Sequence, residues 1–166
     1  EKEGFRRFFV LGVPRDTLDS HMEALKCGDI QASSMDLKPL ALIRAVNRRD
    51  ALIVDVEPTG LCIAICTGGV PMAMRTLEIE PDQGEVEEGA EEIAQEITKT
   101  IKFYNQSCGE APMPEESPIY LTGEFADDPL FARTLEGYAK RPVEFASPSL
   151  VLPDGARTVA TTCASL

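Results

Sequence analysis

Two carboxylates at the end of one apolar run are the residues of this chain best suited to chemistry. Asp55 and Glu57 are separated by a single residue, and in a β-strand this spacing points both side chains to the same face. Carboxylates at neighbouring strand ends can hold two cations about 4 Å apart for phosphoryl transfer. Glu124 or Asp127, after a later predicted strand, and Asp154, near the last predicted helix, could complete such a cluster. Because the chain has 28 acidic residues, carboxylates at strand ends are also expected by chance, and we favour other functions.

The remaining groups of catalytic type indicate no further site. His21 is the only histidine, and on a predicted helix near Asp19 and Glu23 we expect it to be a solvated surface residue. No second histidine is present to help bind a metal ion. The sequence therefore predicts no metal centre and no catalytic residue apart from the carboxylate alternative.

The cysteines are predicted to be reduced. There are five, an odd number, and most lie in apolar segments. Cys62 and Cys66 fall on one predicted strand, where four residues span about 13 Å, too far for a shared metal ion or a disulfide. Free thiols in a protein core are typical of a cytosolic protein, so we expect a cytoplasmic location.

The charge of the chain argues against several classes of partner. A net charge of −12 and a pI of about 4.5 should repel nucleic acid and anionic membrane surfaces, whose binding proteins present basic patches. No apolar run approaches the roughly 20 residues of a membrane span, so no direct membrane insertion is expected. The chain opens at Glu1 without a methionine, close to an apolar stretch, and we interpret it as a fragment of something longer.

The two carboxylates belong to a predicted meander of three antiparallel strands, Leu52–Glu57, Leu61–Cys66 and Val70–Ile79. Pro58-Thr59-Gly60 is a turn signal, and Gly68-Gly69 is a strong hairpin signal because glycine adopts a positive φ without strain. The second strand is apolar on both faces, which predicts a covered sheet with this strand between its hairpin partners. We expect the first strand to lie at the centre of a five-stranded mixed sheet.

Helices and strands are predicted to alternate on either side of the meander. The first fifty residues give a strand, a helix, a weak strand and a helix, which are Phe8–Val13, Arg15–Cys27, Ile30–Met35 and Leu37–Val46. After the meander, the pattern gives a helix, a strand, a helix, a strand and a closing helix, which are Ala90–Gln106, Ile119–Thr122, Asp128–Lys140, Val143–Ala146 and Ala156–Leu166.

From residue 51 the predicted order is β-β-β-α-β-α-β-α, an α/β arrangement typical of the ribonuclease H-like unit, which is also the repeated half of actin-like ATPases. The preceding β-α-β-α segment would be the end of the half before it. We therefore assign residues 1–50 to the C-terminal part of a first actin-like subdomain, and residues 51–166 to a second one.

Four stretches resemble the actin-like proteins of type IV pilus assembly, the PilM kind, which are related more distantly to the division protein FtsA. The stretches are Gly12–Val46, Ala51–Ile79, Glu91–Gln106 and Ile119–Pro148, and together they cover most of the chain. By this resemblance, the second stretch is placed like the phosphate-proximal hairpin of the family. The last is placed like its nucleotide-side strand, glycine and helix.

The resemblance implies where a nucleotide would bind. The candidate residues are Asp55, Thr59 and Gly60 in the phosphate-proximal hairpin and Gly123 at the adenosine motif. ATP with magnesium would be the cofactor of a full-length protein of this kind. For this chain by itself we expect no cofactor, because the first phosphate loop of the family would lie before the sequence begins.

Two substitutions make this a degenerate nucleotide site. Glu57 stands where the family has the first glycine of its second phosphate loop, and Pro58 follows it. Glu124 stands where the family has its second adenosine-side glycine. A glutamate prevents the close backbone approach that glycine permits, and Glu57 also brings negative charge toward a phosphate. ATP hydrolysis by this chain alone is therefore not expected.

The resemblance implies a non-catalytic scaffold of a type IV pilus assembly machine or a related secretion machine. Its partner would be the cytosolic tail of a membrane-anchored pilus assembly protein, and the assembly motor and self-association are further expectations. The protein would thus lie in the cytoplasm, at the inner face of the membrane through its partners. The alternatives are half of an actin-like ATP-binding protein and a metal-dependent ribonuclease H-like enzyme that uses the carboxylates Asp55, Glu57, Glu124 and Asp154.

Overall fold

The computed structural model describes residues 10–79, 86–107 and 112–146 of the chain. These residues belong to two compact units, Glu1–Asp36 and Leu37–Leu166. In the described part of the first unit the regular element is a helix, α1 (Arg15–Cys27), none of whose side chains is buried. His21 lies on this helix, is exposed, and its Nδ1 is 2.7 Å from the Thr17 carbonyl oxygen, which confirms its place at the surface.

The prediction of two strands flanking α1 was wrong for the residues that the structure describes. Residues 10–13, the described part of the first, and Ile30–Met35, the second, have no regular secondary structure. A strand needs a neighbour for its backbone hydrogen bonds, and the sheet of the second unit includes neither segment. Ile30 and Met35 are 56% and 47% exposed, so no apolar packing compensates for the missing partner. The two helices of this lead-in are confirmed.

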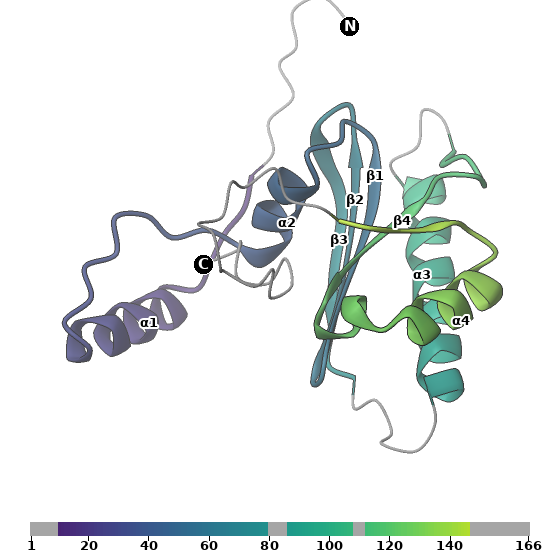
Figure 1. Cartoon of the computed structure of the whole chain (residues 1–166). Coiled ribbons are helices and arrows are strands. Elements are labelled where there is room, and N and C mark those ends of the chain that lie inside the picture. The colour runs from purple at the N-terminus through teal and green to yellow at the C-terminus, as the bar shows by residue number, and fades with distance from the viewer. Residues whose placement is uncertain (1–9, 80–85, 108–111, 147–166) are drawn as a thin grey trace, which may run out of the picture. The chain divides into compact units, whose positions relative to one another are not determined.

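The second unit is a five-stranded mixed sheet with helices on both faces (Figure 1). The strand order is β3-β2-β1-β4-β5, so β1 is central and β2 lies between its hairpin partners, as predicted. The antiparallel meander consists of β1 (Ala51–Glu57), β2 (Gly60–Thr67) and β3 (Val70–Leu77). The other two strands, β4 (Ile119–Gly123) and β5 (Val143–Phe145), run parallel to β1. The helices are α2 (Lys38–Val46), α3 (Val86–Ser107), α4 (Pro129–Ala139) and the short 3-10 helix η1 (Glu124–Asp127).

Two hydrophobic clusters hold these layers together. Side chains of β1 and β2 alternate between them, because successive residues of a strand point to opposite faces. The larger cluster packs the sheet against α3 and α4 and includes Leu52, Ile63 and Ile65, each 0% exposed. The smaller one packs the opposite face against α2 and includes Leu42 and Ile53. Each fully buried aliphatic side chain stabilises the fold by about 1.5–3 kcal/mol relative to an exposed one.

Three further predictions concern the cysteine thiols, membrane-spanning helices and the closing helix. Cys62 and Cys66 are buried, free thiols on β2, as their spacing predicted. No helix in the three described ranges is long and apolar enough to cross a membrane. The closing helix predicted for Ala156–Leu166, together with Asp154, lies outside the residues that the structure describes.

Candidate functional site

Asp55 is the buried charge at the centre of the candidate site. It lies on the α2-facing side of β1, between Cys62 of β2 and Thr122 of β4 in the strand register, and it is 1% exposed. The Thr122 hydroxyl donates a hydrogen bond of 2.7 Å to Asp55 Oδ1. A carboxylate this deep is stable only when it is paired and hydrogen-bonded. Its second oxygen therefore needs a cation.

Lys38 supplies that cation. Its Nζ is 2.5 Å from Asp55 Oδ2 and 3.1 Å from Glu57 Oε1, so one ammonium joins the two carboxylates that share a face of β1. Burial alone lowers the pKa of Lys38, but the hydrogen bonds and charges of Asp55 and Glu57 together raise it above its ordinary value. The ammonium therefore stays protonated at neutral pH. We refer to Lys38, Asp55 and Glu57 as the central cluster.

The local sequence explains why Lys38 sits there. It is the first residue of α2, which carries a proline in its first turn and ends at Asn47 in the left-handed conformation. A cation in the first turn opposes the helix dipole, and this turn has no acidic residue. The position is thus locally unfavourable for lysine, and the two carboxylates of β1 offset the cost. Sequence reasoning missed this residue, because a lysine at a helix start is ordinarily solvated.

The predicted nucleotide-site residues of the hairpin lie in different environments, since Asp55 is buried on β1 and Thr59 is exposed in the turn. Glu57 pairs with Gly60, so Pro58 and Thr59 form the turn, and both are exposed. A Cβ at Gly60 would lie 3.6 Å from the Leu77 carbonyl oxygen, an ordinary van der Waals contact, so this position does not require glycine for space. Of these residues, only Asp55 and Glu57 are joined to Lys38.

Gly123 is required by the backbone around it. Its φ is +93°, and a Cβ there would lie only 2.2 Å from the carbonyl oxygen of Val56, its register partner on β1. Any side chain at this position would collide with a central strand. Gly123 therefore allows β4 to end against β1, directly after Thr122, which binds Asp55.

The amides at the start of α4 are already engaged. Asp128 caps this helix, and its Oδ1 accepts hydrogen bonds from the N–H groups of Leu130 at 2.8 Å and Phe131 at 3.4 Å. A helix N-terminus binds phosphate through such free N–H groups. Glu124 and Asp127 lie in η1 just before the cap and are exposed. This end of the sheet thus presents carboxylates in place of free amide donors.

The two-cation site proposed from sequence does not form among the described residues. No group of three or more histidine, cysteine, aspartate or glutamate side chains in that part of the chain is placed to hold a metal ion. Asp55 and Glu57 converge on Lys38, whereas Glu124 is exposed in η1. The ribonuclease H-like alternative stays a prediction, because its fourth carboxylate, Asp154, lies outside the residues that the structure describes.

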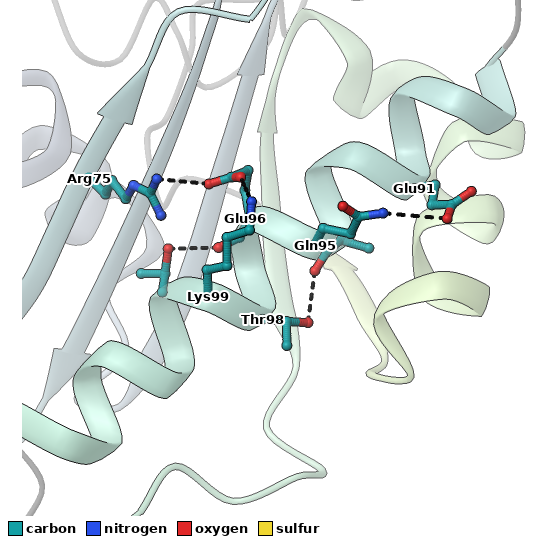
Figure 2. Close-up of polar contacts among 8 residues, drawn as sticks. Arg75, Glu91, Gln95, Glu96, Thr98 and Lys99 are labelled. Atoms are coloured by element: carbon teal, nitrogen blue, oxygen red, sulfur yellow. Dashed lines mark hydrogen bonds and ion pairs between the residues drawn. The ribbon is translucent and has the colours of Figure 1, made fainter.

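A second charged cluster joins the edge strand β3 to α3 (Figure 2). It lies on the α3-facing side of the sheet, because Arg75 pairs with Ile63, which belongs to the larger hydrophobic cluster. Glu96 of α3 lies between two cations: its Oε2 is 3.0 Å from Arg75 Nη2 of β3, and its Oε1 is 2.5 Å from Lys99 Nζ. The side chain of Glu96 is 13% exposed, and those of Arg75 and Lys99 are 41% and 59% exposed. We refer to these three residues as the edge cluster.

Comparison with solved structures identifies the architecture. The ethanolamine utilization protein EutJ from Carboxydothermus hydrogenoformans matches with a TM-score of 0.63 over 86% of this chain and 60% of that one, at 18% identity. A PilM–PilN type IV pilus biogenesis complex matches with a TM-score of 0.58 over 78% of this chain and 47% of that one, at 16% identity. The chain has an actin-like fold.

The chain spans only part of the length of the two matched structures. The chain spans 60% and 47% of the two neighbours, and at 18% and 16% identity the likeness concerns the fold alone. No model of a protein family matches the sequence, and no curated protein is similar enough to count as a relative. The expected actin-like arrangement is thus confirmed, while a closer relationship to PilM is not established by sequence.

Proposed function

We propose that the chain is a non-catalytic actin-like module that serves as a scaffold in a type IV pilus assembly machine or a related secretion machine. The four stretches that resemble the PilM kind support the setting, and the fold likeness to PilM agrees with it. The likeness to EutJ has the higher TM-score, so the pilus setting rests on those stretches more than on the fold. The assignment of residues 1–50 and 51–166 to two subdomains stays a prediction.

The observation that carries the non-catalytic part is the position of Glu57. It ends β1 at the hairpin, and with Asp55 it places two carboxylates beside the ammonium of Lys38. A phosphate at this hairpin would approach the carboxylate of Glu57. One unfavourable charge contact at 4 Å costs about 4 kcal/mol at an effective dielectric near 20. Each 1.4 kcal/mol is tenfold in affinity, so one such contact makes a micromolar site millimolar.

Calorimetry with ATP and magnesium tests this directly. The chain should show no saturable binding below about 1 mM ATP. A Glu57→Gly/Glu124→Gly double variant removes both glutamates and should bind at least about tenfold more tightly. Micromolar binding by the unaltered chain would overturn the non-catalytic proposal. The double variant is the positive control: if it binds ATP, the absence of binding by the unaltered chain can be attributed to the two glutamates.

The scaffold role has its own test. A peptide with the sequence of the short cytosolic tail of a PilN-type protein from the same genome should bind the chain in a fluorescence polarisation titration. A scrambled peptide of the same composition is the control, since charge alone would let both bind this chain equally. Equal binding of the two peptides would contradict the proposed partner. Cytosolic placement at the membrane would follow from that partner.

An intact ATP site in a longer protein is the second candidate function. It is favoured by Asp55 and Gly123, which match the family pattern and lie on the paired central strands β1 and β4. If a longer protein that contains this chain binds ATP while the chain alone does not, this candidate replaces the first. The same calorimetric titration on both proteins separates them.

A further inference from the structure

We infer that the Lys38 ammonium is the built-in cation of this site: it occupies the position between Asp55 and Glu57 that a divalent metal ion would otherwise take, and it makes the site independent of magnesium. This inference deepens the proposed function and rests on it, since both concern the same site. It is tested with a metal ion alone, so its failure is distinct from that of the ATP titration.

The first argument is the direction of the oxygen atoms. Asp55 Oδ1 accepts the hydrogen bond of Thr122, and Asp55 Oδ2 is buried and faces Lys38 at 2.5 Å. Glu57 Oε1 approaches the same nitrogen at 3.1 Å. Hard cations such as magnesium and calcium take carboxylate oxygens as ligands. Two carboxylate oxygens that converge on one point are ligands of the type that such an ion takes, and Lys38 holds that point.

The second argument is that this position requires a cation. Asp55 is 1% exposed, and a buried carboxylate without a partner costs several kcal/mol. The fold nonetheless holds Lys38 at a helix start, where the dipole opposes it, with its side chain only 37% exposed. Both effects disfavour an ammonium at this position, and the carboxylates outweigh them. The raised pKa of Lys38 agrees with this balance.

The consequence is that a metal ion and Lys38 exclude one another. A divalent ion entering the site would lie against an ammonium whose charge repels it. Removing the ammonium charge while keeping a side chain of similar length should open the site to the ion. The edge cluster provides a matched control, since Lys99 also contacts a carboxylate, but Glu96 keeps Arg75 when Lys99 is changed.

Titration of the chain with manganese, followed by electron paramagnetic resonance of the free ion, measures this exclusion. The unaltered chain and Lys99→Gln should show no binding that depends on Asp55. Lys38→Gln should gain one site that is at least about tenfold tighter, and Asp55→Asn in the Lys38→Gln background should remove it. The inference is overturned if Lys38→Gln gains no site, if its site survives Asp55→Asn, or if the unaltered chain already binds manganese through Asp55.

A second measurement needs no variant, in case Lys38→Gln does not fold. Lysine amines of the unaltered chain are acylated in a short pulse, with and without manganese, and each site is quantified by mass spectrometry. Lys38 should react more slowly than Lys99, because its ammonium is held by two carboxylates, and manganese should not change its rate. Faster labelling of Lys38 with manganese would show that the metal displaces it, and this would also overturn the inference.

Discussion

The central and edge clusters place the same kinds of side chain in opposite proportions. In the central cluster one cation, Lys38, lies between the two carboxylates of β1. In the edge cluster one carboxylate, Glu96, lies between two cations, Arg75 and Lys99. Each joins a helix to a strand, and they lie on opposite faces of one sheet. The main physical difference is burial, since Asp55 is 1% exposed and Glu96 is 13% exposed.

This difference teaches that burial, more than the number of ionic contacts, decides what a cluster contributes. An exposed ion pair contributes about 0–1 kcal/mol, because water and salt replace it. Breaking a buried pair costs about 3–5 kcal/mol, because the remaining charge has no partner. Buried Asp55 therefore depends on Lys38, the cation that it contacts. The edge cluster keeps a counter-ion when either cation is removed.

The largest effect is expected at Gly123, where β4 supports the central cluster. Gly123→Ala should destabilise the fold by about 4 kcal/mol or more, since it combines strain at positive φ with a collision against Val56. Gly137→Ala in α4 is the matched control, because a Cβ there meets nothing within 4 Å. It should stabilise the helix by about 0.5–1 kcal/mol. Urea unfolding followed by circular dichroism measures both, and similar midpoints for the two variants would contradict this assignment.

The next effect compares the two lysines. Lys38→Met should destabilise the fold by about 3 kcal/mol, at the lower end of the buried range because the Lys38 side chain is 37% exposed. Lys99→Met should cost less than about 0.5 kcal/mol, because its side chain is 59% exposed and Glu96 keeps Arg75. The measurement is the free energy of unfolding in urea at pH 7. Equal losses would break the comparison between the clusters.

The smallest effect concerns alkaline pH. The pKa of Lys38 is raised in the folded state, so its contribution is fully present below its ordinary value of 10.5 and is lost as pH rises through the higher folded value. Stability should fall above pH 10.5 in the unaltered chain, and less steeply in Lys38→Met. Burial also raises the pKa of Cys62 and Cys66. The alkaline loss from Cys66 is common to both proteins and cancels in the comparison, whereas the charge of Lys38 lowers the pKa of Cys62, so the variant also changes the contribution of that thiol. Parallel pH profiles would contradict the role of Lys38.

The sequence predicted the parts of the fold that depend on local signals. Apolar alternation and the turns at Pro58-Thr59 and Gly68-Gly69 predicted the meander, and helical periodicity predicted α2, α3 and α4. The prediction of a strand at Ile30–Met35 was wrong because strand formation does not depend on local signals alone. Strand formation depends on a neighbouring strand, and the composition of a short segment does not show whether one is present.

The candidate site could be predicted only in part. Asp55 and Glu57 were found because they lie close together on one strand, and both belong to the central cluster. Lys38 was not found, since it is 17 residues before Asp55 in the chain, and a lysine at a helix start is ordinarily solvated. The parallel pairing of β1 with β4 brings Thr122 to Asp55 across 67 residues, a contact that no local pattern predicts.

A pair of double-mutant cycles tests the central claim that Lys38 is the cation required by buried Asp55. One cycle combines Lys38→Met with Asp55→Asn, and the other combines Lys99→Met with Glu96→Gln, all measured by urea unfolding at pH 7. The coupling energy should be about 2–3 kcal/mol for the first pair and below about 0.5 kcal/mol for the second. Equal coupling energies, or a first cycle near zero, would contradict the claim.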